Sequence, residues 1–256
     1  MASAGRHVAV KRMLKNYHAS ADREISLLIE SDGHPNVVRY FFKEIRGDFV
    51  YLALEMCNAS LQDLITSVQR KVSIQAYEPQ VVAYATRKIL FHIALGVRHL
   101  HELRIVHRDL KPANILLAHK TREDSFFEPN SDDGMDQLYR AFINDQYLPK
   151  ISDMGLGKQL SSQSSYGVSV RGGLTEASTI GGAGPGSVGW QAPEIMARRS
   201  TDIPLRNVEY SSDSKEGSPI LESSVNTRTS RSVDIFSLGC VFYSALLPGS
   251  HPFGEW

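Results

Sequence analysis

Short apolar runs dominate the first 57 residues of the chain. The runs at 7–13, 37–42 and 49–56 are rich in β-branched and aromatic residues, which predicts strands. Arg46-Gly47-Asp48 separates the last two runs and predicts the turn of a hairpin. The pattern therefore indicates a small unit built mainly from β-strands.

One helix is expected within this unit, between the first two strands. Ser20 is a candidate N-cap residue, and Asp22 and Glu24 follow it where acidic side chains favour the helix dipole. Glu24 shares a helix face with Leu27 and Leu28, so its carboxylate is expected to point inward. A buried carboxylate requires a cation as its partner.

The pattern becomes helical after this first unit. Apolar residues recur at helical spacing over 82–100, which predicts a long amphipathic helix. The segment 232–247 is apolar nearly all round and predicts a fully buried helix. Two polar stretches interrupt the pattern: 119–149, expected as a surface loop with one short helix, and 198–231, a Ser-rich stretch expected to be flexible.

Composition and charge narrow the class of protein. Lys plus Arg and Asp plus Glu both number 28, so the chain lacks the basic footprint of a nucleic-acid-binding segment. The most apolar segment contains Asp234 and is too short for a membrane span, and no apolar run follows Met1. Cys57 and Cys240 lie far apart in apolar surroundings, as expected in a reducing compartment. We therefore expect a cytosolic segment that binds no nucleic acid.

The segment HRDLKPAN at 107–114 concentrates the candidate chemistry. A carboxylate, an ammonium and an amide lie within six residues as Asp109, Lys111 and Asn114, and Asp153 follows in ISDMGLG. Phosphoryl transfer needs a proton acceptor, a cation near the phosphate and oxygen ligands for Mg²⁺, all held close together. These residue types therefore favour a phosphoryl-transfer site.

Each of these residues also has an ordinary structural interpretation. His107 alone is better explained as a hydrogen-bonded core histidine. For Asp109 and its neighbours, the alternative is a polar loop with a capping aspartate. Apolar residues bury both ends of this loop while its middle stays polar, which favours the functional interpretation.

The order of the motifs resembles that of the eukaryotic protein kinases. The motifs are VAVK (8–11), Glu24, HRDLKPAN (107–114), Asp153-Met154-Gly155, Ala192-Pro193-Glu194 and Asp234. The resemblance implies an α+β, two-lobed protein-kinase-like fold with a small β-rich lobe and a helical large lobe. It also implies that Asp234 accepts hydrogen bonds from the backbone of the catalytic loop.

The resemblance also implies a role for each candidate site residue, with ATP and Mg²⁺ as cofactors. Lys11 and Glu24 would position the α- and β-phosphates, while Glu55 and Cys57 lie where kinases bind adenine through backbone groups. Asp109 would be the base, Lys111 would steady the γ-phosphate, and Asn114 and Asp153 would hold Mg²⁺.

Two departures from the family pattern accompany this resemblance. Met154 stands where the D-F-G motif has Phe, which we interpret as altered switching because Met is apolar and adaptable. Only ten residues precede Lys11, so we expect this chain to lack the glycine loop, and we expect it to lack the helices that normally follow HPFG. We therefore expect a truncated small lobe at 1–57 and a partial large lobe at 58–256.

A narrower resemblance points to the inositol-requiring transmembrane kinase/endoribonucleases, the stress sensors of the endoplasmic reticulum. It rests on ADREISLL, HPNVVRYFF, IVHRDLKPANILL, GSVGWQAPEIM, VDIFSLGCVFY and GSHPFGEW. The resemblance implies a serine/threonine kinase of the unfolded protein response that phosphorylates protein, itself included. It further implies a homodimeric parent protein in the endoplasmic reticulum membrane. The ribonuclease residues have no matching positions in this chain.

The segment between Asp153 and Glu194 is expected to be a mobile activation segment, which Arg108 would order by binding a phosphate. Gly184, Gly186 and Gly189 satisfy G-x-G-x-x-G, but no strand precedes them, so we do not expect a phosphate loop. The candidate phosphorylation sites, unranked, are Ser161, Ser162, Ser164, Ser165, Ser169, Thr175, Ser178 and Thr179.

A competing hypothesis is an inactive, nucleotide-responsive interaction module or a non-functional fragment. The missing glycine loop favours that hypothesis for the chain as written. The presence of Lys11, Asp109, Asn114 and Asp153 favours an enzyme.

Overall fold

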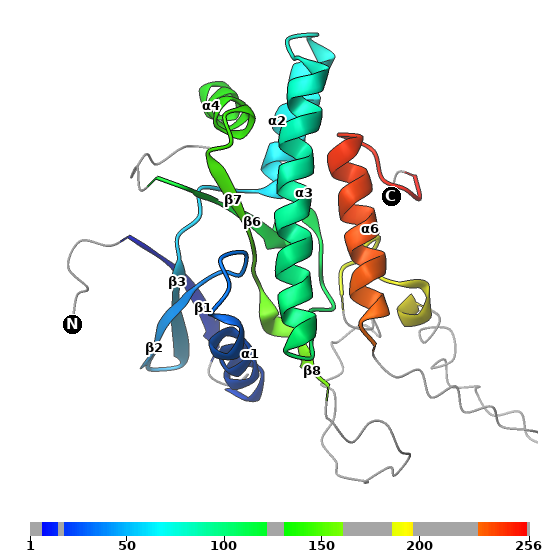
Figure 1. Cartoon of the computed structure of the whole chain (residues 1–256). Coiled ribbons are helices and arrows are strands. Elements are labelled where there is room, and N and C mark those ends of the chain that lie inside the picture. The colour runs from blue at the N-terminus through cyan, green and yellow to red at the C-terminus, as the bar shows by residue number, and fades with distance from the viewer. Residues whose placement is uncertain (1–6, 15–17, 122–130, 161–185, 197–229, 255–256) are drawn as a thin grey trace, which may run out of the picture.

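The computed structural model describes residues 7–14, 18–121, 131–160, 186–196 and 230–254 (Figure 1). All eight candidate phosphorylation sites lie outside the described residues, as does nearly all of the Ser-rich stretch at 198–231. No helix in the described ranges combines the length and the apolar character needed to cross a membrane.

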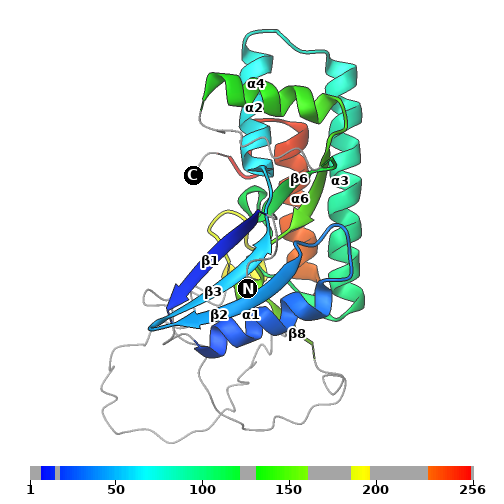
Figure 2. The ribbon, with the colours of Figure 1, turned by 90° about the vertical axis from the view of Figure 1, so that its left-hand side faces the viewer.

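The small lobe is a three-stranded antiparallel sheet with one helix beside it (Figure 2). Strands β1 (Val8–Leu14), β2 (Tyr40–Arg46) and β3 (Phe49–Glu55) form the sheet in the order β1-β3-β2. Helix α1 (His18–Ser31) packs Ile25 against Val50 and Leu52, because these apolar side chains lie on the inner faces of both elements. The three predicted strands and the turn are present, but the second strand runs over Tyr40–Arg46 rather than 37–42.

The predicted start of α1 was wrong. The helix begins at His18, so Ser20 lies inside it rather than at the N-cap position, and its first turn holds no acidic residue. The inward face was predicted correctly, since Glu24, Leu27 and Leu28 are all buried.

The large lobe is built from helices around short strands and turns. Its helices are α2 (Leu61–Ser73), α3 (Pro79–Glu102), α4 (Asp132–Ile143) and α6 (Ser232–Leu246). Its strands are β4 (Ala59–Ser60), β5 (Ile105–Val106), β6 (Ile115–His119), β7 (Tyr147–Ile151) and β8 (Lys158–Gln159). Two 3-10 turns, η2 (Pro112–Asn114) and η3 (Met154–Leu156), follow β5 and β7. The long amphipathic helix is confirmed as α3.

Residues 122–130 of the polar segment 119–149 lie outside the described residues, and its described part is more tightly packed than the expected surface loop. Its short helix is present as α4, but this helix packs on α2 and α3 and buries Leu138 and Phe142 in the core of the large lobe. The end of the segment enters β7, which pairs with β6 in register. The polar residues therefore mark the outer surface of a packed element.

Helix α6 is present as predicted but is not fully buried. Val233 and Val241 are buried, whereas Ile235 is 55% exposed and Leu246 is 54% exposed. Among the described helices, α3 and α2 make the most extensive contacts with α6. Because apolar residues lie all round α6, the sequence led to an overestimate of its burial.

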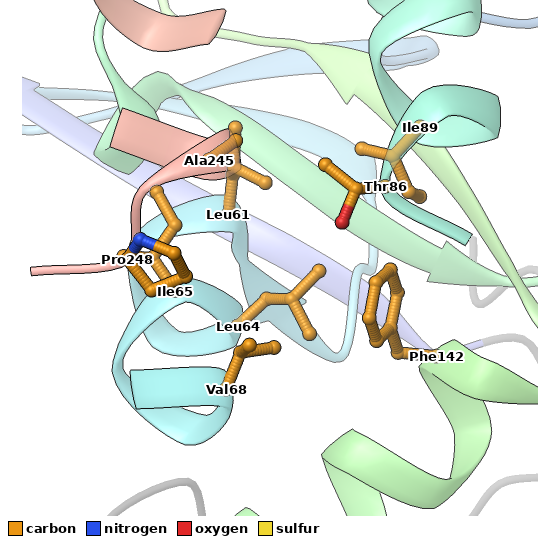
Figure 3. Close-up of a pocket in the computed structure, with 9 residues that line it drawn as sticks. All are labelled: Leu61, Leu64, Ile65, Val68, Thr86, Ile89, Phe142, Ala245 and Pro248. Atoms are coloured by element: carbon orange, nitrogen blue, oxygen red, sulfur yellow. The ribbon is translucent and has the colours of Figure 1, made fainter. Parts of the chain in front are cut away.

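A small apolar cavity lies inside the large lobe (Figure 3). Its walls come from α2, α3, α4, α6 and the residues just after α6: Leu61, Leu64, Ile65, Val68, Thr86, Ile89, Phe142, Ala245 and Pro248. The hydroxyl of Thr86 points toward the space between Leu64 and Phe142. The lining carries no ionisable group, so this cavity does not have the chemistry of the expected phosphoryl-transfer site.

Candidate active site

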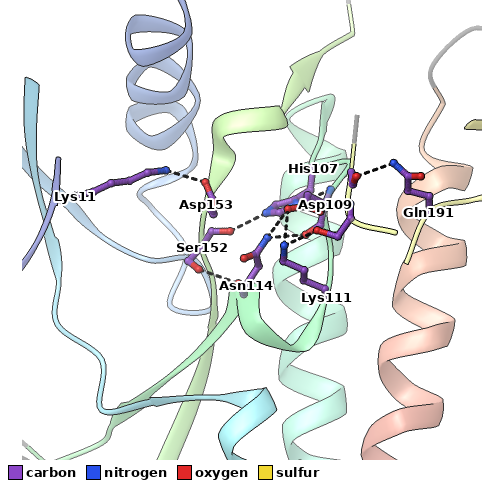
Figure 4. Close-up of polar contacts among 10 residues, drawn as sticks. Lys11, His107, Asp109, Lys111, Asn114, Ser152, Asp153 and Gln191 are labelled. Atoms are coloured by element: carbon purple, nitrogen blue, oxygen red, sulfur yellow. Dashed lines mark hydrogen bonds and ion pairs between the residues drawn. The ribbon is translucent and has the colours of Figure 1, made fainter. Parts of the chain in front are cut away.

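Lys11 joins the two lobes by an ion pair to each. Its Nζ lies 2.6 Å from Glu24 Oε1 on α1 and 2.8 Å from Asp153 Oδ1, which follows β7. The Glu24 side chain is 3% exposed, whereas that of Asp153 is 47% exposed. Figure 4 shows Lys11 reaching from β1 toward Asp153. The three residues predicted from the motifs are thus brought together.

Burial and charge shift the pKa values of this cluster. Burial alone would lower the pKa of Lys11, but the charges of Glu24 and Asp153 outweigh it and raise the pKa. Burial raises the pKa of Glu24, and Lys11 only partly opposes this. Burial would also raise the pKa of Asp153, yet the hydrogen bond and charge of Lys11 bring it below its ordinary value. Near neutral pH the site therefore holds an ammonium beside an ionised, half-exposed carboxylate.

A buried carboxylate on α6 binds the backbone of the loop at 107–114, which we call the catalytic loop. Asp234 on α6 is fully buried and accepts hydrogen bonds from the backbone N–H groups of His107 and Arg108, both at 2.8 Å. The His101 ring on α3 lies 2.9 Å from the same carboxylate. This geometry matches the role that the kinase resemblance implied for Asp234, because a buried charge needs such donors.

Asp109, Lys111 and Asn114 converge at the end of this loop (Figure 4). The side-chain amide of Asn114 donates to Asp109 Oδ2 at 2.9 Å and to the Asp109 carbonyl oxygen at 2.8 Å. Lys111 Nζ lies 3.3 Å from Asp109 Oδ2. The loop thus places a carboxylate, an ammonium and an amide within contact distance, as the sequence predicted.

His107 supports this arrangement from within the core. It is fully buried, its ring lies 2.8 Å from the Ser152 carbonyl oxygen, and it accepts a hydrogen bond from the Asp109 backbone N–H at 3.2 Å. The ring therefore links the loop that carries Asp109 to the residue just before Asp153. The ordinary interpretation of His107 as a hydrogen-bonded core histidine is correct.

Ser187 is a site residue that sequence reasoning missed. Its backbone N–H donates to Asp109 Oδ1 at 2.8 Å, and its hydroxyl contacts Lys111 Nζ. Gly186 makes this approach possible: its φ is +112°, and a Cβ there would lie 2.8 Å from the Arg108 carbonyl oxygen. Gly186 therefore allows close packing of this segment on the loop at 107–114, and no local pattern around Ser187 signalled its contact with Asp109.

The predicted adenine-binding segment connects the lobes at the end of β3. Glu55 N donates to the Arg39 carbonyl oxygen at 2.8 Å, and the Glu55 side chain contacts Lys150 at 2.8 Å. Cys57 is half-buried, and burial raises the pKa of its thiol to about 12. The thiol therefore stays protonated near neutral pH.

The residues present suit a magnesium ion bound together with phosphates. Asn114 uses its amide nitrogen to contact Asp109, which leaves its side-chain oxygen to face away from that carboxylate. Asp153 supplies an ionised carboxylate, and Mg²⁺ is commonly held by one or two such protein oxygens plus substrate phosphates. No cluster of three or more His, Cys, Asp or Glu side chains suited to a metal occurs among the described residues.

Comparison with known proteins identifies the family. The family model described as "Protein kinase domain" matches residues 1–205, which is most of the chain. The chain therefore belongs to the protein kinase family, and the α+β, two-lobed fold predicted from its motifs is confirmed.

The narrower resemblance is confirmed as well. The chain is 40% identical over 254 residues to the serine/threonine-protein kinase/endoribonuclease ireA of Aspergillus fumigatus. It is 38% identical over 250 residues to the sensor for unfolded proteins in the ER ire1 of Schizosaccharomyces pombe, and 37% identical over 252 residues to the human serine/threonine-protein kinase/endoribonuclease IRE2. Each match covers 98% of this chain but only 19%, 19% and 20% of the relative, so the chain spans about a fifth of their length.

Proposed function

We propose that the chain is the catalytic domain of a serine/threonine protein kinase, which transfers the γ-phosphoryl group of Mg·ATP to a protein hydroxyl. The observation that supports this most is the joint geometry of Lys11, Glu24 and Asp153 across the lobes. Phosphoryl transfer depends on positioning and charge neutralisation, and these residues supply both.

Each residue then has a distinct task. Asp109 accepts the proton of the attacking serine or threonine hydroxyl, and Lys111 neutralises charge beside it. Lys11, held by Glu24, contacts the α- and β-phosphates. Asn114 and Asp153 hold Mg²⁺, which when bound neutralises the charge of the β- and γ-phosphates.

The two lobes divide this work. We assign residues 1–57 to the small lobe, which orients the nucleotide through Lys11 and the backbone of Glu55 and Cys57. Residues 58–256 form the large lobe, which carries the base and the metal ligands. Closure of one lobe on the other brings Lys11 to Asp153.

The relatives suggest the wider setting. One is named as a sensor for unfolded proteins in the ER, and others as kinase/endoribonucleases. We propose that this chain is the cytosolic kinase segment of such a sensor, anchored in the endoplasmic reticulum membrane through other parts of the protein. Its substrate is then protein, with its own activation segment included, and the sensor acts as a homodimer.

Phosphate incorporation from radiolabelled ATP tests the proposal. The full chain should phosphorylate itself or a generic protein substrate, and Asp109→Asn should lower the rate by on the order of 10²-fold or more. Asp133→Asn, an exposed change on α4, is the matched control and should leave the rate unchanged. Mg·ATP binding without any incorporation by the unmodified chain would overturn the enzyme proposal and favour the interaction module.

A further inference from the structure

Lys150 is a buried lysine that the catalytic scheme does not use. It lies on β7, three residues before Asp153, and its side chain is only 9% exposed. Its Nζ is 2.8 Å from Glu55 Oε2 at the end of β3. A buried ammonium needs partners that compensate for its lost hydration, and the Glu55 carboxylate is one such partner.

The same ammonium reaches a third segment, the loop between α1 and β2. Lys150 Nζ donates to the Pro35 carbonyl oxygen at 3.0 Å. Glu55 Oε2 also accepts a hydrogen bond from the Arg39 backbone N–H at 3.2 Å. One ion pair thus connects this loop, the segment between the lobes and the strand that leads to Asp153.

Backbone contacts that do not involve Lys150 already join this loop to both other segments, since Glu55 N donates to the Arg39 carbonyl oxygen at 2.8 Å. Ile151 N donates to the Asn36 carbonyl oxygen and Val38 N to the Ile151 carbonyl oxygen, both at 2.9 Å. The Asn36 side chain adds a hydrogen bond to the Pro149 carbonyl oxygen at 2.9 Å. Because these contacts hold the backbone, the distinct contribution of Lys150 is to bind the Glu55 carboxylate directly to β7.

Glu55 begins the segment through which the nucleotide base is expected to bind. We propose that Lys150 is a positioning residue that, through Glu55, fixes this segment in the conformation that binds the nucleotide. The proposal rests on the proposed function, since it assumes that residues 55–57 contact ATP. Lys150 itself touches neither the phosphates nor the metal.

Kinetics of Lys150→Met test this proposal. Met keeps the apolar stem and removes the charge, so the KM for ATP should rise about fivefold, the factor that corresponds to one net hydrogen bond. The value of kcat should stay within about twofold, because binding lost equally from ground and transition states raises KM alone. Lys150→Arg keeps a cation within reach of Glu55 and should restore most of the affinity.

The chain offers a matched control in Lys71. Its ion pair with Asp136 has a 2.6 Å separation and a lysine side chain that is 15% exposed, but it joins α2 to α4 away from the site. Lys71→Met should lower the melting temperature without changing the KM for ATP. A merely structural Lys150 would behave in the same way, so the contrast in KM separates the two roles.

Glu55→Gln provides a second variant, which tests the proposal even where Lys150→Met does not fold. Its dissociation constant for Mg·ADP, measured by calorimetry, should rise as for Lys150→Met, and the double variant should be no weaker than either single one. Additive effects, or an unchanged KM in Lys150→Met, would overturn the proposal while leaving the kinase assignment intact. If the unmodified chain binds no Mg·ADP, that result contradicts the proposed function itself, and the proposal for Lys150 falls with it.

Discussion

Gly96 lies on α3 against the loop after α1. A Cβ at this position would lie 2.8 Å from the Asn36 carbonyl oxygen and 2.9 Å from Ile151 Cδ1. The Asn36 carbonyl oxygen accepts the backbone hydrogen bond of Ile151, so it cannot retreat without lengthening that bond. Gly96→Ala therefore tests how tightly the large lobe holds the loop of the small lobe.

Two opposing terms set the size of the effect. Ala is favoured over Gly inside a helix by about 1 kcal/mol, whereas overpacking against atoms that cannot move costs about 1–3 kcal/mol. Contact with a hydrogen-bonded backbone oxygen places Gly96 in the upper part of that range, so we expect Gly96→Ala to lower the free energy of unfolding by about 1–2 kcal/mol. Gly239→Ala is the matched control, because Gly239 lies in α6 with no atom within 4 Å of the added Cβ.

Urea denaturation of both variants measures the difference. Gly239→Ala should gain about 1 kcal/mol, so the two variants should differ by about 2–3 kcal/mol. In a chain of this length each kcal/mol corresponds to a shift in melting temperature of about 2–4 °C. If Gly96→Ala gains as much stability as Gly239→Ala, the loop yields freely and the close approach imposes no constraint.

Three further changes address the core and the pH dependence. The buried Thr86 places its hydroxyl in the apolar cavity, so Thr86→Val should raise the free energy of unfolding by about 1 kcal/mol in urea denaturation, and a loss would show that the hydroxyl has a partner. Asp234→Asn turns an N–H donor toward the catalytic-loop backbone and should cost about 2–4 kcal/mol in the same assay, whereas a cost below about 1 kcal/mol would contradict the anchoring role. Burial and the stacked His99 ring lower the pKa of His34 in the folded state, so the unfolded state binds more protons below pH 6.5 and stability should fall as the pH drops. His34→Gln should reduce that fall in melting temperature; an identical pH profile would refute the assignment.

Local sequence patterns correctly predicted those elements that are determined mainly by residues close together in the sequence. The strand runs, the hairpin turn and the long helix were readable because their apolar residues repeat with the period of the element. The loop at 107–114 was readable because Asp109, Lys111 and Asn114 are close in sequence, so their chemistry shows without a fold. Their distances to one another then follow from a short stretch of backbone.

The failures arise where contacts come from distant parts of the chain. Ser187 lies 78 positions from Asp109, and only the packing of Gly186 on the catalytic loop brings it there. The exposed side of α6 was missed because burial depends on which elements lie beside a helix. The composition of α6 does not reveal those neighbours. The short helix expected within 119–149 is present as α4, but its packing into the core was missed because its polar surface does not reveal the few apolar residues beneath it.

Backbone strain shows why the site depends on such distant contacts. Arg108 and Asp153 are non-glycine residues with left-handed φ values of 68° and 62°, and each lies beside or within the predicted chemistry. Such a conformation costs on the order of 1–3 kcal/mol and persists only where surrounding contacts impose it. Asp234 accepts the Arg108 N–H at 2.8 Å, and Lys11 holds Asp153 Oδ1 at 2.8 Å, so each strained residue has a charged partner from elsewhere in the fold. The motif residues therefore specify the chemistry, while α6 and β1 impose the backbone geometry in which that chemistry can occur.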